Sequence, residues 1–234
     1  MIKDIIRKLH SELPATVKLV AVSKFHPFES IEEAYSAGQR IFAESRPQEL
    51  SAKVKTLQAR RDEMGDPDYM SDVEWHFIGH LQTNKLKMVL PYVSLIESVD
   101  SLRLLEAINA WGAANNKVSD VLLECFISSD DTKQGFPAEE IMDIVMSESK
   151  YENIRIRGVM GMASYTDDVD VVRGDFKKLA DVFAQLAEKI GKCPNLDESC
   201  TEISMGMSGD YPIAIEEGST MVRIGSMIFG ERYV

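Results

Sequence analysis

A lysine closes the first strongly apolar run of this 234-residue chain. Residues 19–24 read LVAVSK, which is typical of a buried strand whose alternate side chains share a face. Val20, Val22 and Lys24 then lie on one face, so an inward Val22 implies an inward Lys24. A lysine in an apolar interior must be neutral or bonded, and a neutral amine can condense with an aldehyde to form a Schiff base. The alternative is a strand-end lysine that reaches solvent along its apolar stem.

Small residues follow two later apolar runs. Residues 204–208 read SMGMS, and Gly225-Ser226 ends the last run. Such residues let backbone N–H groups approach a phosphate, and a helix N-terminus would add its dipole. They are also the ordinary residues of tight turns. Both loops together therefore predict a phosphate site only if the fold brings them to one place.

Arg223 lies two residues before Gly225 and so shares its face of the strand. A buried guanidinium needs a partner. The ring nitrogen of a cofactor would serve, and so would an interior carboxylate such as Glu124. The pattern alone leaves both partners open.

His76 and His80 are four residues apart, a spacing that on a helix would suggest a metal pair. Here they span a strand end and a glycine loop, and no HExxH glutamate lies between them. We therefore expect no metal site. Cys125 is expected to be a buried, inert thiol.

Eight strand-like runs alternate with helical stretches. They are 17–24, 40–45, 75–79, 94–99, 121–127, 155–163, 200–205 and 221–226. Strict alternation predicts a parallel sheet, either a closed (β/α)8 barrel or an open doubly wound sheet. The count of eight and the lack of glycine in the first turn favour an α/β fold with a single TIM-type barrel spanning 1–234. Helices are expected at 30–38, 81–90, 101–115 and 174–191, and an N-terminal helix (1–13) is expected to cover the place of an eighth outer helix. The polar stretch 60–71 is expected to be a surface loop.

The chain is acidic, with 26 basic and 38 acidic residues and a formal net charge of −12. This charge predicts that neither nucleic acid nor an anionic membrane is a partner. The three cysteines have no CxxC spacing, which is typical of a reducing compartment. With no apolar signal or membrane-spanning run, a cytoplasmic location is expected.

The active sites of such barrels lie at the C-terminal ends of the strands, where these unusual residues fall. Over nearly its whole length the sequence also resembles the pyridoxal phosphate homeostasis protein family, which is related to the N-terminal domain of bacterial alanine racemases. The matching segments are 21–24 with Pro27, 75–79 with Leu81-Gln82 and Asn84-Lys85, 98–101, Lys133 with Gly135, 157–160, 204–208, 218–225 and 228–232.

The resemblance implies a barrel that binds pyridoxal 5′-phosphate (PLP). Lys24 matches the Schiff-base lysine, and Arg223 matches the arginine that faces the pyridine nitrogen. The phosphate site is matched by Ser204, Gly225 and Ser226, and pocket-lining positions by Ser45, His80 and Met205. Two residues depart from the family: Ser45 stands where an asparagine is usual, and Gly209 stands where an acidic residue is usual.

The family resemblance also favours a carrier over an enzyme. The electron sink of PLP works best with a protonated ring nitrogen, and a cationic arginine partner disfavours that proton. Racemisation also needs acid–base groups on both faces of the substrate, and one of these comes from a second domain in alanine racemases. We expect no complete catalytic set, but a monomeric carrier that buffers PLP in vitamin B6 homeostasis and hands it to PLP-dependent apo-enzymes. The alternatives are a PLP-dependent racemase or lyase, and a cofactor-free Schiff-base aldolase.

Overall fold

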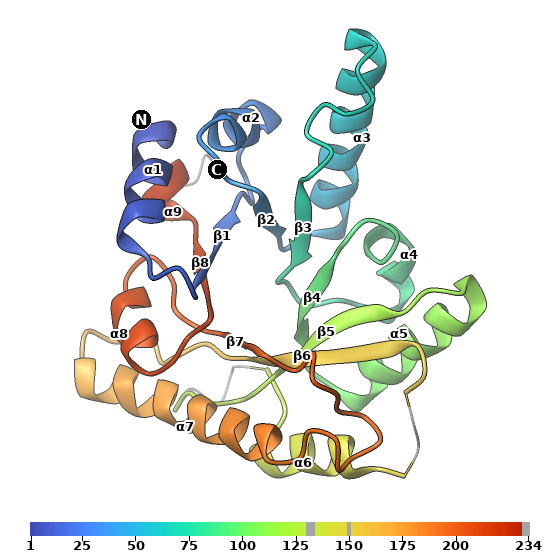
Figure 1. Ribbon diagram of the computed structural model, residues 1–234, viewed down its shortest axis with the longest axis vertical. Coiled ribbons are helices and arrows are strands. Elements are labelled where there is room, and N and C mark those ends of the chain that lie inside the picture. The colour runs from blue at the N-terminus through green and yellow to red at the C-terminus, as the bar shows by residue number, and fades with distance from the viewer. Residues whose placement is uncertain (130–133, 149–150, 231–234) are drawn as a thin grey trace.

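The computed structural model describes residues 1–129, 134–148 and 151–230 (Figure 1). Lys133 and the segment 231–232, which carry part of the sequence resemblance, lie outside the described residues.

Eight parallel strands form a closed barrel in which each strand pairs with the next and β8 pairs with β1. The strands are β1 (Lys18–Val22), β2 (Ile41–Glu44), β3 (Glu74–Phe77), β4 (Leu95–Val99), β5 (Ser119–Glu124), β6 (Ile154–Met160), β7 (Glu202–Ser204) and β8 (Met221–Ile224). The prediction of a closed (β/α)8 barrel is confirmed, and the open sheet is excluded. Most strands are shorter than their apolar runs because the chain leaves the ladder before the run ends.

Helices surround the barrel. They are α1 (Ile2–Glu12), α2 (Phe28–Ser36), α3 (Pro47–Met64), the 3₁₀ turn η1 (Thr83–Lys85), α4 (Leu86–Val89), α5 (Leu102–Asn115), α6 (Ala138–Met146), α7 (Val169–Ala187), α8 (Tyr211–Glu216) and α9 (Ser226–Phe229). The predicted N-terminal helix is present as α1, which packs against α2 and the short α9 where the barrel closes.

One local prediction was wrong. Residues 60–64, expected to be loop, form the last turn of α3. The segment is polar, but arginine, glutamate and methionine are good helix formers on a solvated face. The helix ends at Gly65, whose φ of +62° is the left-handed conformation that glycine adopts at helix C-termini.

The apolar core has two parts separated by the strands. Inside the barrel, Val20, Val22, Leu122, Met160 and other residues form a small cluster. A much larger cluster lies between the barrel and the helices, and includes the intervening strand residues such as Ala21. This alternation follows from the period of two along each strand, so the small inner cluster leaves interior positions for polar groups.

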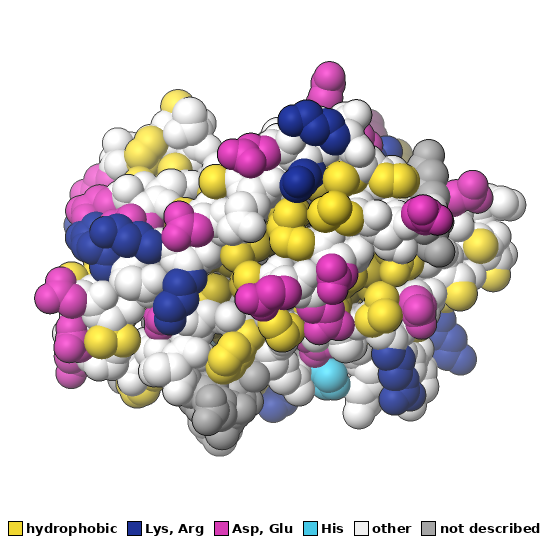
Figure 2. Space-filling view, turned by 90° about the horizontal axis from the view of Figure 1, so that it is seen from below, with side chains coloured by type: hydrophobic (Ala, Val, Ile, Leu, Met, Phe, Trp, Pro, Cys, Tyr) yellow, Lys and Arg dark blue, Asp and Glu magenta, His cyan; other side chains and the backbone are white. Residues whose placement is uncertain are grey.

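Figure 2 shows the face below α6 and α7 in Figure 1. Among the described residues in that view, Lys and Arg side chains are interspersed with acidic and hydrophobic ones. Within the described ranges, no helix is long and apolar enough to cross a membrane.

Candidate cofactor site

A cavity of about 490 Å³ lies at the C-terminal end of the barrel strands. Its volume is within the range of small-molecule sites. Four residues predicted from the sequence line it: Lys24, Arg223, Gly225 and Ser226. The remaining lining residues are Val22, His26, Ile78, Met160, Met162, Tyr165, Met207, Ser208, Gly209 and Gly230.

Lys24 lies in the turn that follows β1, two residues beyond the inward-facing Val22. The next residue, Phe25, has a φ of +69°, which is uncommon for a residue with a side chain. Its N–H donates to Glu49 Oε1 at 2.5 Å. Lys24 is half-buried and is one of the residues that line the cavity.

A buried ion network behind the cavity holds this turn. Lys53 Nζ, on α3, donates to Ser23 O at 2.8 Å, to Glu44 Oε1 at 2.6 Å and to Glu49 Oε1 at 3.0 Å. Ser23 Oγ also donates to Glu44 Oε1 at 2.6 Å. Burial raises the pKa of Glu44, and the charge and hydrogen bonds of Lys53 and Ser23 oppose that rise. The network ties α3 to both ends of the turn that carries Lys24.

His26 is a lining residue that the sequence analysis missed. It is buried and stacks on Phe229 of α9 with ring centroids 5.3 Å apart. Burial lowers its pKa, the positive charge of Lys53 lowers it further, and Glu49 opposes the shift. The cavity therefore has a neutral imidazole on the turn that carries Lys24. Its position two residues after Lys24 was the only signal in the sequence.

Arg223 is 4% exposed and lies on the inner face of β8. Its Nη1 donates to Ser204 Oγ at 2.7 Å, and its Nη2 donates to Gly161 O at 3.0 Å. Glu97 Oε2 lies 4.0 Å from Nη1. Burial lowers the pKa of Arg223, and the charges of Glu97, Glu124 and Asp210 oppose the shift. Glu97 thus makes the ion pair, while Glu124, the carboxylate considered from the sequence, contributes through its charge.

The loops after β7 and β8 meet at the cavity, as the sequence predicted. Ser208 and Gly209 line it beside Gly225 and Ser226, and Met227 N–H donates to Ser208 Oγ at 3.4 Å. The chain turns there at Gly206, whose φ is +93° and where an added Cβ would lie 2.6 Å from Ala214 Cβ. Glycine at this position therefore allows the loop after β7 to turn and to pack closely against α8.

The structure does not bring every predicted residue to this cavity. Ser204 is fully buried in the barrel interior, where its Oγ donates to Glu97 Oε2 at 2.5 Å. Its neighbour Met205 points the opposite way, into the core between barrel and helices. Ser45 precedes α3 and is not among the lining residues.

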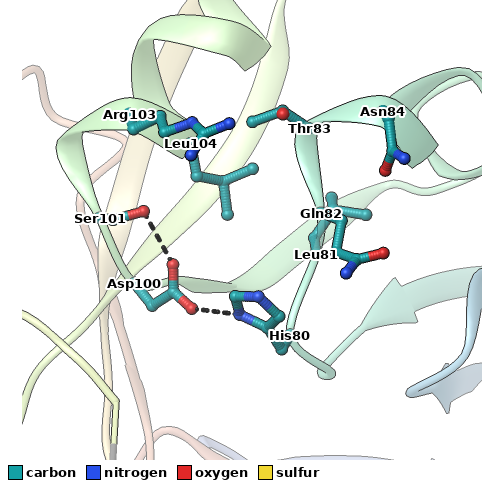
Figure 3. A pocket seen from close by; sticks show the side chains of 9 residues that line it. All are labelled: His80, Leu81, Gln82, Thr83, Asn84, Asp100, Ser101, Arg103 and Leu104. Atoms are coloured by element: carbon teal, nitrogen blue, oxygen red, sulfur yellow. Dashed lines mark hydrogen bonds and ion pairs between the residues drawn. The ribbon is translucent and has the colours of Figure 1, made fainter.

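His80 lines a separate cavity of about 440 Å³ at the ends of β3 and β4 (Figure 3). Its Nδ1 lies 2.7 Å from Asp100 Oδ2, and Ser101 Oγ donates to the other oxygen of Asp100 at 3.0 Å. Gln82, Asn84 and Arg103 are among the other lining residues. Ile78 lines the Lys24 cavity, whereas His80, two residues later, lines the separate one.

These features define a class: a parallel (β/α)8 barrel with a lysine after its first strand and small-residue loops after its last two. The model of the alanine racemase N-terminal domain family matches residues 2–233. The chain belongs to this family and, within it, to the pyridoxal phosphate homeostasis proteins.

Two relatives of that name illustrate the similarity. The protein from Aquifex aeolicus is 36% identical over 215 residues, covering 92% of this chain and 87% of the relative. The human protein is 36% identical over 242 residues, covering 99% and 82%.

Solved structures of similar proteins have the same fold as this chain. PipY from Synechococcus elongatus with PLP bound is 33% identical, with a TM-score of 0.83, covering 98% of this chain and 100% of PipY. Alanine racemase from Bartonella henselae shares the fold at 15% identity, with a TM-score of 0.69 over 99% of this chain and 58% of the racemase.

Proposed function

We propose that this protein binds PLP as a Schiff base on Lys24 and serves PLP homeostasis as a carrier. The observation that carries the proposal is that Lys24, Arg223, Gly225 and Ser226 line one cavity. These residues come from opposite ends of the chain and meet only because β8 pairs with β1. The similarity to PLP-bound PipY and to the pyridoxal phosphate homeostasis proteins supports the same ligand.

The residues of the cavity fit PLP part by part. The ligand has an aldehyde, an anionic phosphate and an aromatic ring. The amine of Lys24 suits the aldehyde, and the small-residue loops at Ser208-Gly209 and Gly225-Ser226 offer backbone N–H groups to the phosphate. Val22, Ile78 and Met160 would provide apolar contacts for the ring, and Arg223 would offer a guanidinium to its nitrogen. In this proposal Ser208 and Gly209 contact the phosphate, whereas Ser204, which the family resemblance matched to the phosphate site, does not line the cavity.

When bound, PLP supplies an aldehyde carbon that forms one C=N bond to a primary amine with loss of one water. The contribution of this chain is to hold and orient the ligand. The turn fixed by Lys53 and Glu49 presents Lys24 to the cavity. The lowered pKa of His26 disfavours a positive charge on this cavity-lining imidazole.

Borohydride trapping tests the assignment. PLP-loaded protein is reduced, digested and mapped by mass spectrometry, and we expect the pyridoxyl adduct on Lys24. Lys24→Ala should lose the visible absorbance and the adduct, whereas Lys85→Ala, which alters a lysine outside the cavity, should keep both. Full retention of the chromophore by Lys24→Ala, or an adduct confined to Lys85, would refute the site.

We propose that the protein is a carrier and not a racemase or lyase. Arginine is a strong base, so Arg223 remains a cation; a cation facing the ring nitrogen would disfavour its protonation and so weaken the electron sink. Turnover of D- or L-amino acids by the PLP-loaded protein would contradict this.

The proposal extends to a monomer that works in the cytoplasm and passes PLP to apo-enzymes. Gel filtration and transfer of PLP to an apo-aminotransferase are the direct measurements.

A further inference from the structure

Four buried polar side chains form a continuous hydrogen-bonded chain through the barrel interior. His76 Nδ1 on β3 lies 2.7 Å from Glu97 Oε1 on β4. Glu97 Oε2 accepts a hydrogen bond from Ser204 Oγ on β7, which in turn accepts one from Arg223 Nη1 on β8. All four residues are at most 4% exposed. Arg223 is the member of this chain that lines the Lys24 cavity.

The His76 end of this hydrogen-bonded chain reaches the N-terminal mouth of the barrel, opposite the Lys24 cavity. His76 lines a cavity of about 260 Å³ there. Lys18, Glu74 and Glu202, each the first residue of its strand, also line this cavity, as do Asp120 and Arg157. The hydrogen-bonded chain therefore spans the barrel from its N-terminal mouth to the cofactor cavity.

Burying the ions of this chain costs free energy because they lose their hydration, and only their mutual contacts offset that cost. Burial would raise the pKa of Glu97, but the hydrogen bond and charge of His76, the charge of Arg223 and the hydrogen bond of Ser204 together lower it. Glu97 is thus an anion fully enclosed by its partners. It makes the ion pair of Arg223 and, through Ser204, fixes the direction of its Nη1.

We propose that Glu97, oriented by His76 from the far side of the barrel, is a positioning residue that holds Arg223 in the cavity and thereby sets the electronic state and retention of the bound cofactor. This inference rests on the proposed binding of PLP at Lys24. Arg223 would act on the ligand directly, and Glu97 and His76 would act only through it. A purely structural role would predict loss of stability without a change at the ligand.

The test compares PLP-loaded wild type with Glu97→Gln. The visible absorption band of bound PLP and its release rate into excess apo-enzyme are measured on protein with wild-type circular dichroism. We expect the band to shift and release to accelerate about tenfold, the size expected for disturbing a hydrogen bond to a charged group. The matched control is Glu202→Gln. This carboxylate is similarly buried, lies two residues from Ser204 and pairs with Lys18, so its loss should leave the band and release unchanged.

Two further comparisons keep the proposal testable if Glu97→Gln does not fold. Ser204→Ala removes the bridge to Arg223 without removing a charge and should also shift the band and accelerate release relative to wild type. His76→Asn keeps an N–H near the place of Nδ1 and should resemble wild type, whereas His76→Leu should resemble Ser204→Ala. An unchanged band and release rate in Ser204→Ala and His76→Leu, or an equal change in Glu202→Gln, would overturn the inference. Borohydride mapping of wild type separates the two failures, because an adduct on Lys24 leaves the proposed function intact.

Discussion

Replacing Lys53 by methionine tests whether the buried ion network shapes the Lys24 turn. The substitution roughly conserves side-chain volume but removes the ammonium that bonds Ser23 O, Glu44 Oε1 and Glu49 Oε1. The side chain of Lys53 is 7% exposed and that of Glu44 is 0% exposed. Water therefore cannot hydrate the unpaired carboxylate of Glu44 unless the surrounding structure rearranges. Glu49, at 20%, can recover part of its hydration.

The decrease in the free energy of unfolding should therefore come mainly from the buried carboxylate of Glu44, which is left without its ion-pair partner. Removing one partner of a buried ion pair costs about 3–5 kcal/mol, a large share of the roughly 5–15 kcal/mol that stabilises a typical domain. We expect Lys53→Met to lower the free energy of unfolding by about that amount at pH 8, measured by urea denaturation with far-UV circular dichroism. The pyridoxyl adduct at Lys24 should also form more slowly, because the turn loses its anchor.

The pH dependence of this loss has a definite sign. Without Lys53 the pKa of Glu44 rises further, since burial then acts with less opposition. An acid whose pKa is higher in the folded than in the unfolded state stabilises the fold most at low pH, and loses that contribution as the pH rises through the folded value. The destabilisation should therefore be smaller at pH 5 than at pH 8. The double variant Lys53→Met/Glu44→Gln, which has no buried charge to neutralise, should recover part of the loss. A single variant within 1 kcal/mol of wild type, or no recovery in the double variant, would refute the reasoning.

Two further predictions concern residues next to the site. The pKa of His26 is lowered from 6.5 by burial and by Lys53, so below about pH 6.5 the unfolded chain takes up this proton before the folded one. The free energy of unfolding should fall as the pH drops from there towards the folded value, and His26→Gln should lack that component in urea titrations. Parallel pH profiles for the two proteins would contradict the assignment. At Gly158 on β6, φ is +146° and an added Cβ would lie 1.8 Å from Glu202 O. Gly158→Ala should therefore cost about 2–5 kcal/mol from overpacking and backbone strain. Gly174→Ala in α7, where nothing lies within 4 Å, should instead stabilise by up to about 1 kcal/mol. Similar urea midpoints for the two variants would count against this account.

The period of two along each strand made part of the site predictable. That period predicted an inward Lys24 and an inward Arg223, and both line the cavity, although Lys24 and Gly225 lie just beyond the ends of β1 and β8. The same rule separates Ser204 from Met205, since neighbours along a strand face opposite sides. Met205 was included by family resemblance alone, and its side chain lies in the outer core.

The sequence by itself determined the order of strands and helices, the closed barrel, and which strand ends carry the lysine, the arginine and the small-residue loops. These properties depend on the hydrophobic periodicity within each segment and on the presence of eight strand-like segments. Both can be recognised from residues that are close together in the sequence. Only the tertiary structure decided that Glu97 makes the ion pair of Arg223, that Ser208 lines the cavity and Ser204 does not, and that His80 lies in a separate cavity. Contacts across a barrel depend on the stagger between strands. The register shifts in the β4–β5 and β5–β6 pairs, so these contacts cannot be read from spacing along the chain.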